Sequence, residues 1–324
     1  MILLVVEHDR GELAPATLEG LTAARALAAE TGLEVEALVL GDEAPDDELV
    51  EQLGAYGAQT IHQVEHDLLG DYGPEVWGEA LAQAMDELTP EFVLATGTDR
   101  GNEVVAQAAA RRGLPMVANC IEIRPGDPAE VTRVRWGGSL LEVATLDAEP
   151  ALITIAHHSI EASPADDPAA PETEDLEVDL DEVLGRSLIV NRVEREAGIT
   201  LSTAPVVVGG GRGVGSPDGF GPLEELAKLL GGAVGCSRAV TNNGWRNHAD
   251  QVGQTGTRIA PEIYLACGIS GAIQHWVGAM ASKTILAINT DAEANMVAKA
   301  DYAVIADLHE VIPAVAAEIQ RRRG

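Results

Sequence analysis

The first half of the chain alternates short apolar runs with stretches of helical spacing. Apolar runs with strand propensity occupy residues 2–7, 35–40, 59–64 and 92–95. Between them, apolar residues recur every three or four positions, over residues 13–29, 50–55, 74–88 and 102–111. That spacing places them on one face of a helix. The alternation predicts a parallel sheet covered by helices on both of its faces.

The pattern changes at about residue 116, where strands follow one another without helices between them. These predicted strands are residues 117–123, 131–136, 140–145 and 151–155, joined by turns such as Arg-Pro-Gly-Asp at 124–127. An antiparallel edge added to the parallel sheet accounts for this change. We therefore expect an N-terminal α/β domain that resembles nucleotide-binding domains and contains a mixed sheet.

An acidic segment at about residues 163–183 follows this domain. It has few large apolar side chains, so we predict a solvated linker. A calcium loop is a poorer interpretation, because the glycine that such a loop needs at its sharp turn is missing. We place the domain boundary near Ile199, which gives an N-terminal domain of residues 1–199 and a C-terminal domain of residues 200–324.

The C-terminal domain returns to the alternation of strand and helix. Its predicted strands are residues 206–208, 233–236, 263–267, 284–289 and 302–306. Its predicted helices are residues 222–230, a helix from about residue 272, residues 292–299 and residues 308–323. This order predicts a Rossmann-like domain with a parallel sheet.

Polar side chains follow the predicted strands of this domain. They are Arg212, Ser237, Arg238, Ser270, Asn289 and Asp307. Open α/β sheets bind ligands at the carboxyl ends of their strands, so these side chains form a credible site. The glycine run at 209–215 fits neither the GxGxxG fingerprint nor the GK[ST] loop, and it indicates an anion site without specifying the ligand.

The stretch from Gly268 to His275 lies at the centre of this site. Its glycine turn presents backbone amides and the start of a helix, which suits a phosphate group, and Ser270 is placed to cap that helix. His275 follows Gly271 by four residues, and because Gly271 has no side chain we expect it to leave room for the imidazole to reach across the turn toward a ligand. Taken singly, each residue has a structural alternative: a cap, a surface ion pair or a core histidine.

The charge of the chain is unevenly distributed. The net charge is −31, and residues 1–190 contain 39 acidic and 9 basic side chains against 13 and 12 in residues 191–324. Only 3 lysines accompany 18 arginines. This halophilic-type composition indicates a salt-rich cytoplasm, although an acidic surface for a partner would look similar. Nucleic acid is excluded as a ligand class, because no basic face is present.

The cysteines and the apolar segments indicate the cellular compartment of the protein. Cys120, Cys236 and Cys267 are widely spaced, which indicates reduced thiols in a cytoplasmic protein. Residues 1–6 are too short for a signal peptide, and residues 263–282 contain polar and glycine positions that argue against direct membrane insertion.

Isolated histidines and tryptophans have plain interpretations. His62 and His66 share one face of a strand, and His157-His158 follow another strand. Two imidazoles do not complete a metal site, so we predict surface or edge residues and no metal. The four tryptophans, Trp136 among them, are interpreted as core or interface residues.

Several segments together resemble the electron transfer flavoprotein alpha subunit family. They are the opening ILLVVEHDRGELAPATLEGLTAAR, GGRG at 210–213, SRA at 237–239, QVGQTG at 251–256, APE.Y at 260–264, GISGAIQH at 268–275, AIN at 287–289 and ADYAVIADL at 300–308. The resemblance spans both ends of the chain, and QVGQTG followed by GISGAIQH is highly specific.

The resemblance implies a redox flavoprotein without substrate turnover of its own. It implies a heterodimer with a beta subunit that holds AMP, or a second FAD, and one FAD bound mainly by the C-terminal domain. Implied donors are flavin dehydrogenases, and an implied acceptor is an oxidoreductase such as a quinone reductase. The implied FAD contacts are Arg212, Ser237, Arg238, Val252, Gly253, Gln254, Thr255, Ser270, Gly271, Ala272, Ile273, Gln274, His275, Asn289, Asp307 and Leu308. Among them, Arg238 and His275 would tune the flavin from its N5 edge and its C2 carbonyl.

The chain departs from the family between SRA and QVGQTG. It reads VTNNGWRNHAD at 240–250, where the family commonly has a VDAGW-like stretch with a proline before the glutamine. This difference affects how the loop lies over the flavin edge.

Two alternatives belong to other classes. Ser270 in Gly-Ile-Ser-Gly-Ala approximates the nucleophile elbow of a serine hydrolase, with Asp301 or Asp307 and His309 in the required order. Its fifth position is Ala272 where glycine is expected. The second alternative is a nucleotide-binding regulator, or an NAD enzyme, of the same architecture without flavin.

Overall fold

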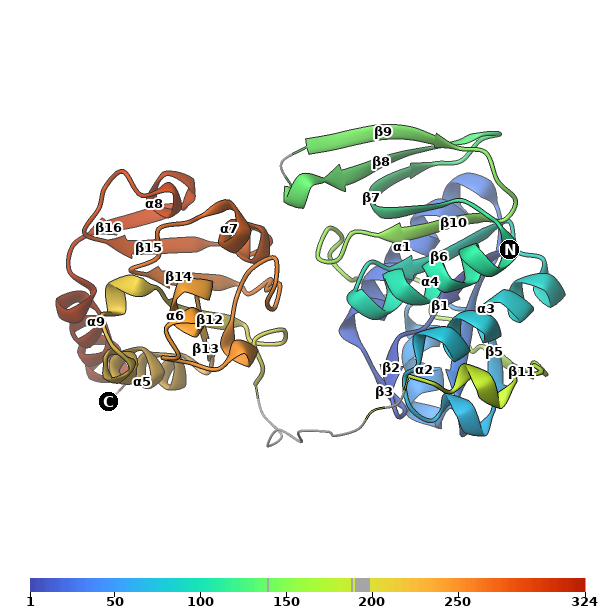
Figure 1. The fold of residues 1–324 in the computed structure, drawn as a ribbon, viewed down its shortest axis with the longest axis horizontal. Coiled ribbons are helices and arrows are strands. Elements are labelled where there is room, and N and C mark those ends of the chain that lie inside the picture. Colours follow the sequence, from blue (N-terminus) through green and yellow to red (C-terminus); the bar gives the residue numbers. More distant parts are fainter. Residues whose placement is uncertain (139, 188, 190–198, 324) are drawn as a thin grey trace. The chain divides into compact units, whose positions relative to one another are not determined.

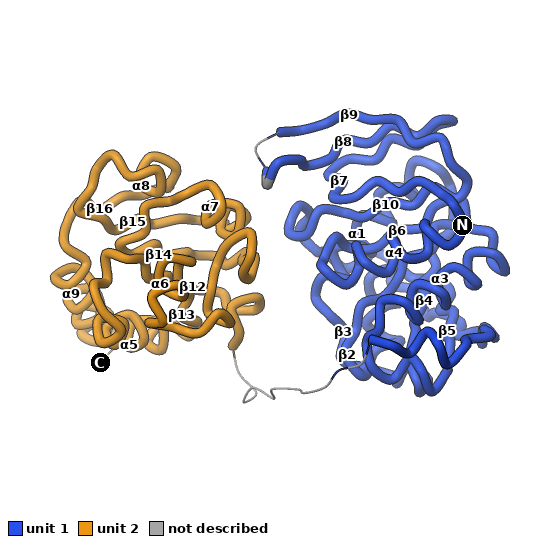
Figure 2. The backbone as a smooth tube through the Cα atoms, viewed as in Figure 1, with its two compact units in different colours: residues 1–193 blue, residues 194–324 orange. Residues whose placement is uncertain are grey.

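The computed structural model describes residues 1–138, 140–187, 189 and 199–323, which form two compact units. Unit 1 comprises residues 1–193 and unit 2 comprises residues 194–324 (Figure 2). The boundary predicted near Ile199 stays a prediction, because residues 190–198 lie outside the described residues.

Unit 1 is built on a sheet of nine strands in the order β11-β5-β4-β1-β6-β10-β7-β8-β9 (Figure 1). Its parallel strands are β1 (Ile2–Val5), β4 (Val35–Gly41), β5 (Thr60–Glu65), β6 (Phe92–Thr96), β10 (Ala151–Ile155) and β11 (Glu172–Asp175). β7 (Met116–Arg124) also runs parallel to its neighbour β10, and β8 (Ala129–Arg135) and β9 (Leu140–Leu146) extend the sheet from β7 as an antiparallel edge. A small antiparallel ladder joins β2 (His8–Asp9) to β3 (Glu12–Leu13). The α/β class and the mixed sheet are confirmed.

Helices cover both faces of this sheet, because its central strands β1, β4, β6 and β10 have apolar side chains on both sides. Apolar residues of α1 (Pro15–Thr31) and α2 (Asp47–Ala55) pack in one core cluster with the strand side chains on one face of the sheet. Those of α3 (Pro74–Leu88) and α4 (Asp99–Arg112) pack in a second cluster with the other set. The side chains of β1 illustrate the division, since Ile2 and Leu4 belong to the first cluster and Leu3 and Val5 to the second.

The acidic segment predicted to be a solvated linker instead packs on unit 1. Strand β11 pairs in parallel with β5, and the side chains of all four of its residues are exposed. Farther along, Leu176, Val178 and Leu180 pack against the α3 and α4 cluster. The segment joins the sheet because strand pairing uses backbone groups, and this apolar alternation at every second residue anchors it.

Unit 2 contains a sheet of five parallel strands in the order β13-β12-β14-β15-β16. They are β12 (Val206–Gly210), β13 (Ala233–Cys236), β14 (Ile263–Cys267), β15 (Ile285–Asn289) and β16 (Tyr302–Ile305). Apolar residues of α5 (Gly221–Leu230) and α9 (Leu308–Arg323) pack in one core cluster, and those of α7 (Ile273–Ala279) and α8 (Asn295–Lys299) in the other. The Rossmann-like parallel sheet is confirmed. Among the described helices, none combines the length and the apolar composition that crossing a bilayer requires.

Candidate functional site

Parallel pairing in unit 2 brings the carboxyl ends of its five strands to one edge of the sheet (Figure 1). The six polar residues predicted at the ends of these strands therefore lie at one edge of the sheet. Among them, Arg212 follows β12, and the short helix α6 (Arg238–Asn242), which the sequence does not predict, begins directly after Ser237. Both arginine side chains are exposed, and no carboxylate pairs with either of them in the part of the chain that the structure describes. This edge therefore offers two available positive charges.

The loops after β12 and β14 touch at the point where the strand order reverses. The N–H of Gly211 donates to the carbonyl of Cys267 at 2.8 Å, and that of Gly213 donates to the carbonyl of Gly268 at 3.1 Å. A Cβ on Gly211 would lie 2.2 Å from the carbonyl oxygen of Gly268, so only glycine fits here. In open α/β sheets this reversal opens the crevice in which ligands bind.

The turn after β14 is held from behind by the segment that follows β15. Gly271 has φ +78°, and a Cβ there would lie 2.3 Å from the backbone nitrogen of Met296. The Ser270 carbonyl accepts a hydrogen bond from that nitrogen at 3.1 Å, and the Asn289 side chain donates to the carbonyl of Ile269 at 3.1 Å. The front of the turn stays open, with exposed side chains at Ser270, Ala272, Ile273 and Gln274.

Two predictions about this turn are wrong in detail. Helix α7 begins at Ile273 after Ala272, without a side-chain cap, so Ser270 contributes its carbonyl and not a capping hydroxyl. Gly271 is needed because Met296 approaches it closely, not because it leaves room for His275.

The loop 251–256 packs against the start of α7. Gln251 is buried, accepts a hydrogen bond from the hydroxyl of Thr241 at 2.7 Å and donates to that of Thr255 at 3.0 Å. The Gln254 N–H donates to the carbonyl of Gln274 at 2.7 Å. A residue central to the family motif, Gln251, therefore orders the loop from inside, while the side chains of Gln254 and Thr255 are exposed.

Two of the predicted contacts have side chains in the core. Val252 and Leu308 are 1% and 5% exposed and belong to the two apolar clusters of unit 2. They can meet a ligand only through backbone atoms. Asp307 is exposed, and its carboxylate accepts the N–H of His309 at 2.9 Å.

His275 turns inward, which differs from the prediction that its ring reaches across the turn. It is 6% exposed, and its Nε2 lies 2.8 Å from the Tyr264 hydroxyl, which is fully buried on β14. Burial lowers the pKa of His275 to about 4, and the Val252 carbonyl partly opposes this shift. The imidazole is therefore neutral at pH 7, so it does not offer a positive charge to a ligand.

The other ring nitrogen of His275 has no hydrogen-bond partner among the described residues. Nδ1 is buried, and the Val252 carbonyl faces the ring without a hydrogen bond of good geometry to this atom. Leaving a buried polar atom unpaired costs about 1–3 kcal/mol. Nε2 is paired with the Tyr264 hydroxyl, so Nδ1 is the ring atom that a ligand group would satisfy.

The geometry does not support a serine hydrolase. The ring of His275 pairs with Tyr264, and Asp307 holds the backbone of His309 and not its ring. Across the described ranges, no hydrogen bond joins the Ser270 hydroxyl to a histidine.

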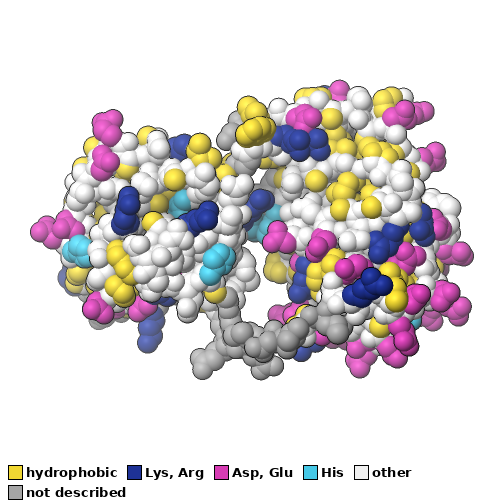
Figure 3. Space-filling model, in the orientation of Figure 1, with side chains coloured by type: hydrophobic (Ala, Val, Ile, Leu, Met, Phe, Trp, Pro, Cys, Tyr) yellow, Lys and Arg dark blue, Asp and Glu magenta, His cyan; other side chains and the backbone are white. Residues whose placement is uncertain are grey.

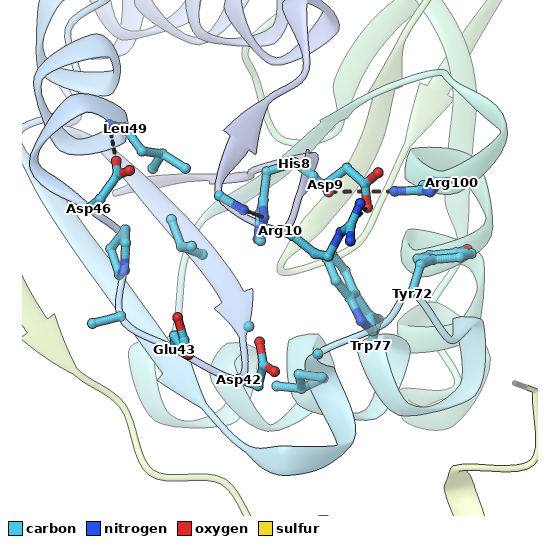
Figure 4. A pocket seen from close by; sticks show the side chains of 17 residues that line it. His8, Asp9, Arg10, Asp42, Glu43, Asp46, Leu49, Tyr72, Trp77 and Arg100 are labelled. Atoms are coloured by element: carbon cyan, nitrogen blue, oxygen red, sulfur yellow. Dashed lines mark hydrogen bonds and ion pairs between the residues drawn. The ribbon is translucent and has the colours of Figure 1, made fainter. Parts of the chain in front are cut away.

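Unit 1 contains a pocket that sequence reasoning missed. It lies at the carboxyl ends of β1 and β4, and its lining includes His8, Arg10, Asp42, Tyr72, Trp77 and Arg100 (Figure 4). The His8 ring is already saturated, since Nε2 lies 2.8 Å from the Leu40 carbonyl and Nδ1 accepts the Gly11 N–H at 3.2 Å. None of the predicted FAD contacts lies in this pocket.

Comparison with known proteins identifies both halves of the chain. Residues 2–181 match the electron transfer flavoprotein domain, and residues 200–280 match the electron transfer flavoprotein FAD-binding domain. The chain is 34% identical to electron transfer flavoprotein subunit alpha of Thermoanaerobacterium thermosaccharolyticum, over 99% of this chain and 98% of that protein. It is 37% identical to the subunit alpha of Mycobacterium tuberculosis, over 100% and 99%. It is 34% identical to Protein FixB of Clostridium saccharobutylicum, over 98% and 95%.

The depressed pKa of His275 makes a prediction about pH and stability. A folded-state pKa of about 4 lies below the ordinary value of 6.5, so the unfolded chain binds the proton first as pH falls. This contribution to the free energy of unfolding is fully present above pH 6.5 and is lost as pH falls toward 4, on the order of 3 kcal/mol in all.

We expect the His275→Gln variant to lose this part of the pH dependence of its free energy of unfolding. Urea unfolding between pH 7 and pH 4 measures it, and NMR of the imidazole protons reports the titration directly. The His309→Gln variant is the matched control, because His309 is exposed. A His275 ring that titrates near pH 6.5 would contradict its burial.

Proposed function

The chain belongs to the electron transfer flavoprotein alpha subunit family, and from this premise we propose that it is the FAD-binding subunit of a heterodimeric electron carrier. The carrier accepts electrons from flavin dehydrogenases and passes them to an oxidoreductase such as a quinone reductase. It turns over no substrate of its own. The FAD-binding domain match covers residues 200–280, which contain 13 of the 16 predicted contacts.

The observation that carries this proposal is the arrangement at the carboxyl edge of the unit 2 sheet. The open turn 270–274, the loop 251–256 and the strand-end arginines lie on loops of that one edge. The site fits a flavin dinucleotide, since it combines a close backbone contact at the strand-order reversal with a buried ring nitrogen, His275 Nδ1, that has no hydrogen-bond partner of good geometry among the described residues.

We propose the following assignment of contacts. The turn of Ser270, Gly271, Ala272, Ile273 and Gln274 holds the diphosphate through its amides. Arg212, Ser237, Asn289, Asp307, the loop Val252, Gly253, Gln254 and Thr255, and the backbone of Leu308 hold the rest of the dinucleotide. Arg238 lies beside the ring, and His275 donates from Nδ1 to an acceptor on it.

Bound FAD supplies reversible transfer of electrons, and the chain supplies charge and exclusion of water. Arg238 would place a guanidinium beside the ring, where its positive charge would stabilise the negative charge of a reduced flavin. A neutral His275 contributes a hydrogen bond in place of a full charge, because its burial disfavours protonation. Of the two residues proposed beside the ring, Arg238 is therefore the charged one.

We propose that the beta subunit completes the carrier by holding AMP or, in a bifurcating form, a second FAD. Co-purification of both subunits followed by a count of FAD and AMP per heterodimer tests this. One FAD with one AMP supports a simple carrier, and two FAD molecules support bifurcation. A heterodimer that stays without flavin after incubation with FAD would refute the proposed function.

Replacing Arg238 with alanine tests its role beside the flavin. We expect the heterodimer to keep its FAD and the reduction potential of that FAD to fall by about 30–60 mV, which corresponds to roughly 1 kcal/mol for one electron. Spectroelectrochemical titration measures the potential. The matched control is Arg322→Ala, since Arg322 is exposed near the far end of α9 and pairs with Glu318. Equal reduction potentials of the bound FAD in Arg238→Ala and Arg322→Ala would contradict the proposed role of Arg238.

Exposed apolar side chains on the edge strand β9 and on the turn that precedes it support a surface for the beta subunit. Trp136, Leu140, Leu141 and Val143 are 56–81% exposed, and β9 is an edge strand. Exposed apolar patches of this kind mark interfaces, and an unpaired edge strand needs cover. We propose that the beta subunit covers this face.

The substitution Leu141→Glu tests this surface. We expect a rise of at least about tenfold in the dissociation constant of the heterodimer, because a charge would be buried in an apolar contact. Isothermal titration calorimetry with the purified beta subunit measures it. Val183→Glu is the control, since Val183 is 54% exposed elsewhere in unit 1. Unchanged affinity in Leu141→Glu would place the interface elsewhere.

We further propose that the chain works in a salt-rich cytoplasm. The acidic side chains crowd unit 1, and many are visible on the face shown in Figure 3. The three cysteines are buried and free, and burial raises the pKa of each thiol to about 12, as expected for reduced, unreactive thiols. The acidic side chains of unit 1 repel one another, and this repulsion destabilises the folded state unless salt screens it.

We expect the thermal midpoint of unfolding to rise by about 5 °C or more between 0.1 M and 2 M KCl. Repulsion falls with screening, and differential scanning calorimetry measures the change. Glucose of equal osmolarity is the control for solute exclusion. A midpoint that does not change with KCl, or that rises equally in glucose, would contradict adaptation to salt. It would favour the alternative that the acidic surface binds a partner.

A further inference from the structure

Unit 1 brings together three metal-ligating side chains that the flavin site does not use. Glu19 lies on α1, and His157 and His158 follow directly after β10. One ligand atom from each of them lies within 4.8 Å of both others. We propose that Glu19, His157 and His158 bind a divalent transition-metal ion of the zinc, cobalt or nickel type.

The distances fit a single ion held by all three residues. Glu19 Oε1 lies 3.2 Å from His158 Nδ1 and 3.7 Å from His157 Nε2. Ligands bound to one zinc ion at about 2.0–2.1 Å with tetrahedral angles are about 3.3 Å apart. Imidazole nitrogens favour zinc, cobalt and nickel over calcium and magnesium, which prefer all-oxygen sites. The set leaves a fourth position for water or another ligand.

The backbone at His158 places both rings on the same side. His157 and His158 lie in the turn that follows β10. His158 has φ +62°, an uncommon conformation for a residue other than glycine. The two imidazoles therefore stack, with ring centroids 3.5 Å apart, and both approach Glu19.

Glu19 is held in position by its second oxygen. Its Oε2 accepts the backbone N–H of His158 at 2.7 Å, which leaves Oε1 facing the two rings. Such a partner on the outer side of a ligand fixes its orientation toward the metal.

The surroundings favour a cation. The side chains of Glu19 and His158 are each 11% exposed and that of His157 is 21% exposed, so the cluster is largely desolvated yet reachable from solvent. Residues 1–190 contain 30 more acidic than basic side chains, which concentrates cations near unit 1. The competing account is a structural cluster in which one protonated imidazole pairs with Glu19 and no metal binds.

Titration of the full chain with Zn²⁺ alone, and separately with Co²⁺ alone, tests the proposal. We expect one equivalent of Zn²⁺ by calorimetry, and visible absorption bands from Co²⁺ with nitrogen and oxygen ligands. The Glu19→Gln variant keeps an acceptor for the His158 N–H and removes the charge. The His157→Asn variant removes one imidazole ligand and leaves Glu19, the acceptor for the His158 N–H, unchanged. Each should weaken binding by at least about tenfold.

The control is His309→Asn, which removes an exposed histidine of unit 2 and should leave Zn²⁺ binding unchanged. Circular dichroism confirms that each variant is folded. Absence of stoichiometric Zn²⁺ binding would favour the protonated cluster and overturn the proposal. Equal affinity in Glu19→Gln, His157→Asn and the unaltered chain would overturn it as well. The flavin content of the protein is measured separately and reports on the site in unit 2. Failure of the metal proposal is therefore distinguishable from failure of the proposed function.

Discussion

The backbone contact between the loops after β12 and β14 is the constraint on which the rest of unit 2 depends. Gly211 and Gly213 donate to Cys267 and Gly268 with no side chain between the loops, and a Cβ at Gly211 would collide with the Gly268 carbonyl. Because the two loops leave the sheet toward opposite faces, this contact fixes the floor of the crevice. The turn 268–275 is then held from behind by Met296 and Asn289, and its front remains available.

Much of this architecture follows from local pattern. The strands are apolar runs, the helices between them have one apolar face, and pairing parallel strands leaves only one edge where their carboxyl ends can meet. The positions of Arg212, Ser237 and Arg238 at that edge were therefore predictable from the sequence. The family motifs added the identity of the ligand, which spacing alone left open.

Features that depend on distant residues were not predictable in this way. The ring of His275 is directed by Tyr264 and by burial, neither of which is visible in the helical spacing around it. Strand β11 consists of exposed polar residues, so its membership of the sheet rests on backbone pairing with β5. Glu19 precedes His158 by 139 positions, and only the fold reveals that it completes the histidine cluster. In each case tertiary contacts decide what the local pattern leaves undetermined.

The buried and unpartnered Nδ1 of His275 has a consequence for the life of the subunit in the cell. In the proposed assignment FAD satisfies this ring nitrogen, and a loaded chain is then harder to unfold, because a ligand that binds the native state depletes the unfolded population. Proteases and chaperones act on that unfolded population. Subunits made in excess of their cofactor are therefore cleared sooner than loaded ones, so the abundance of the carrier follows the supply of its prosthetic group.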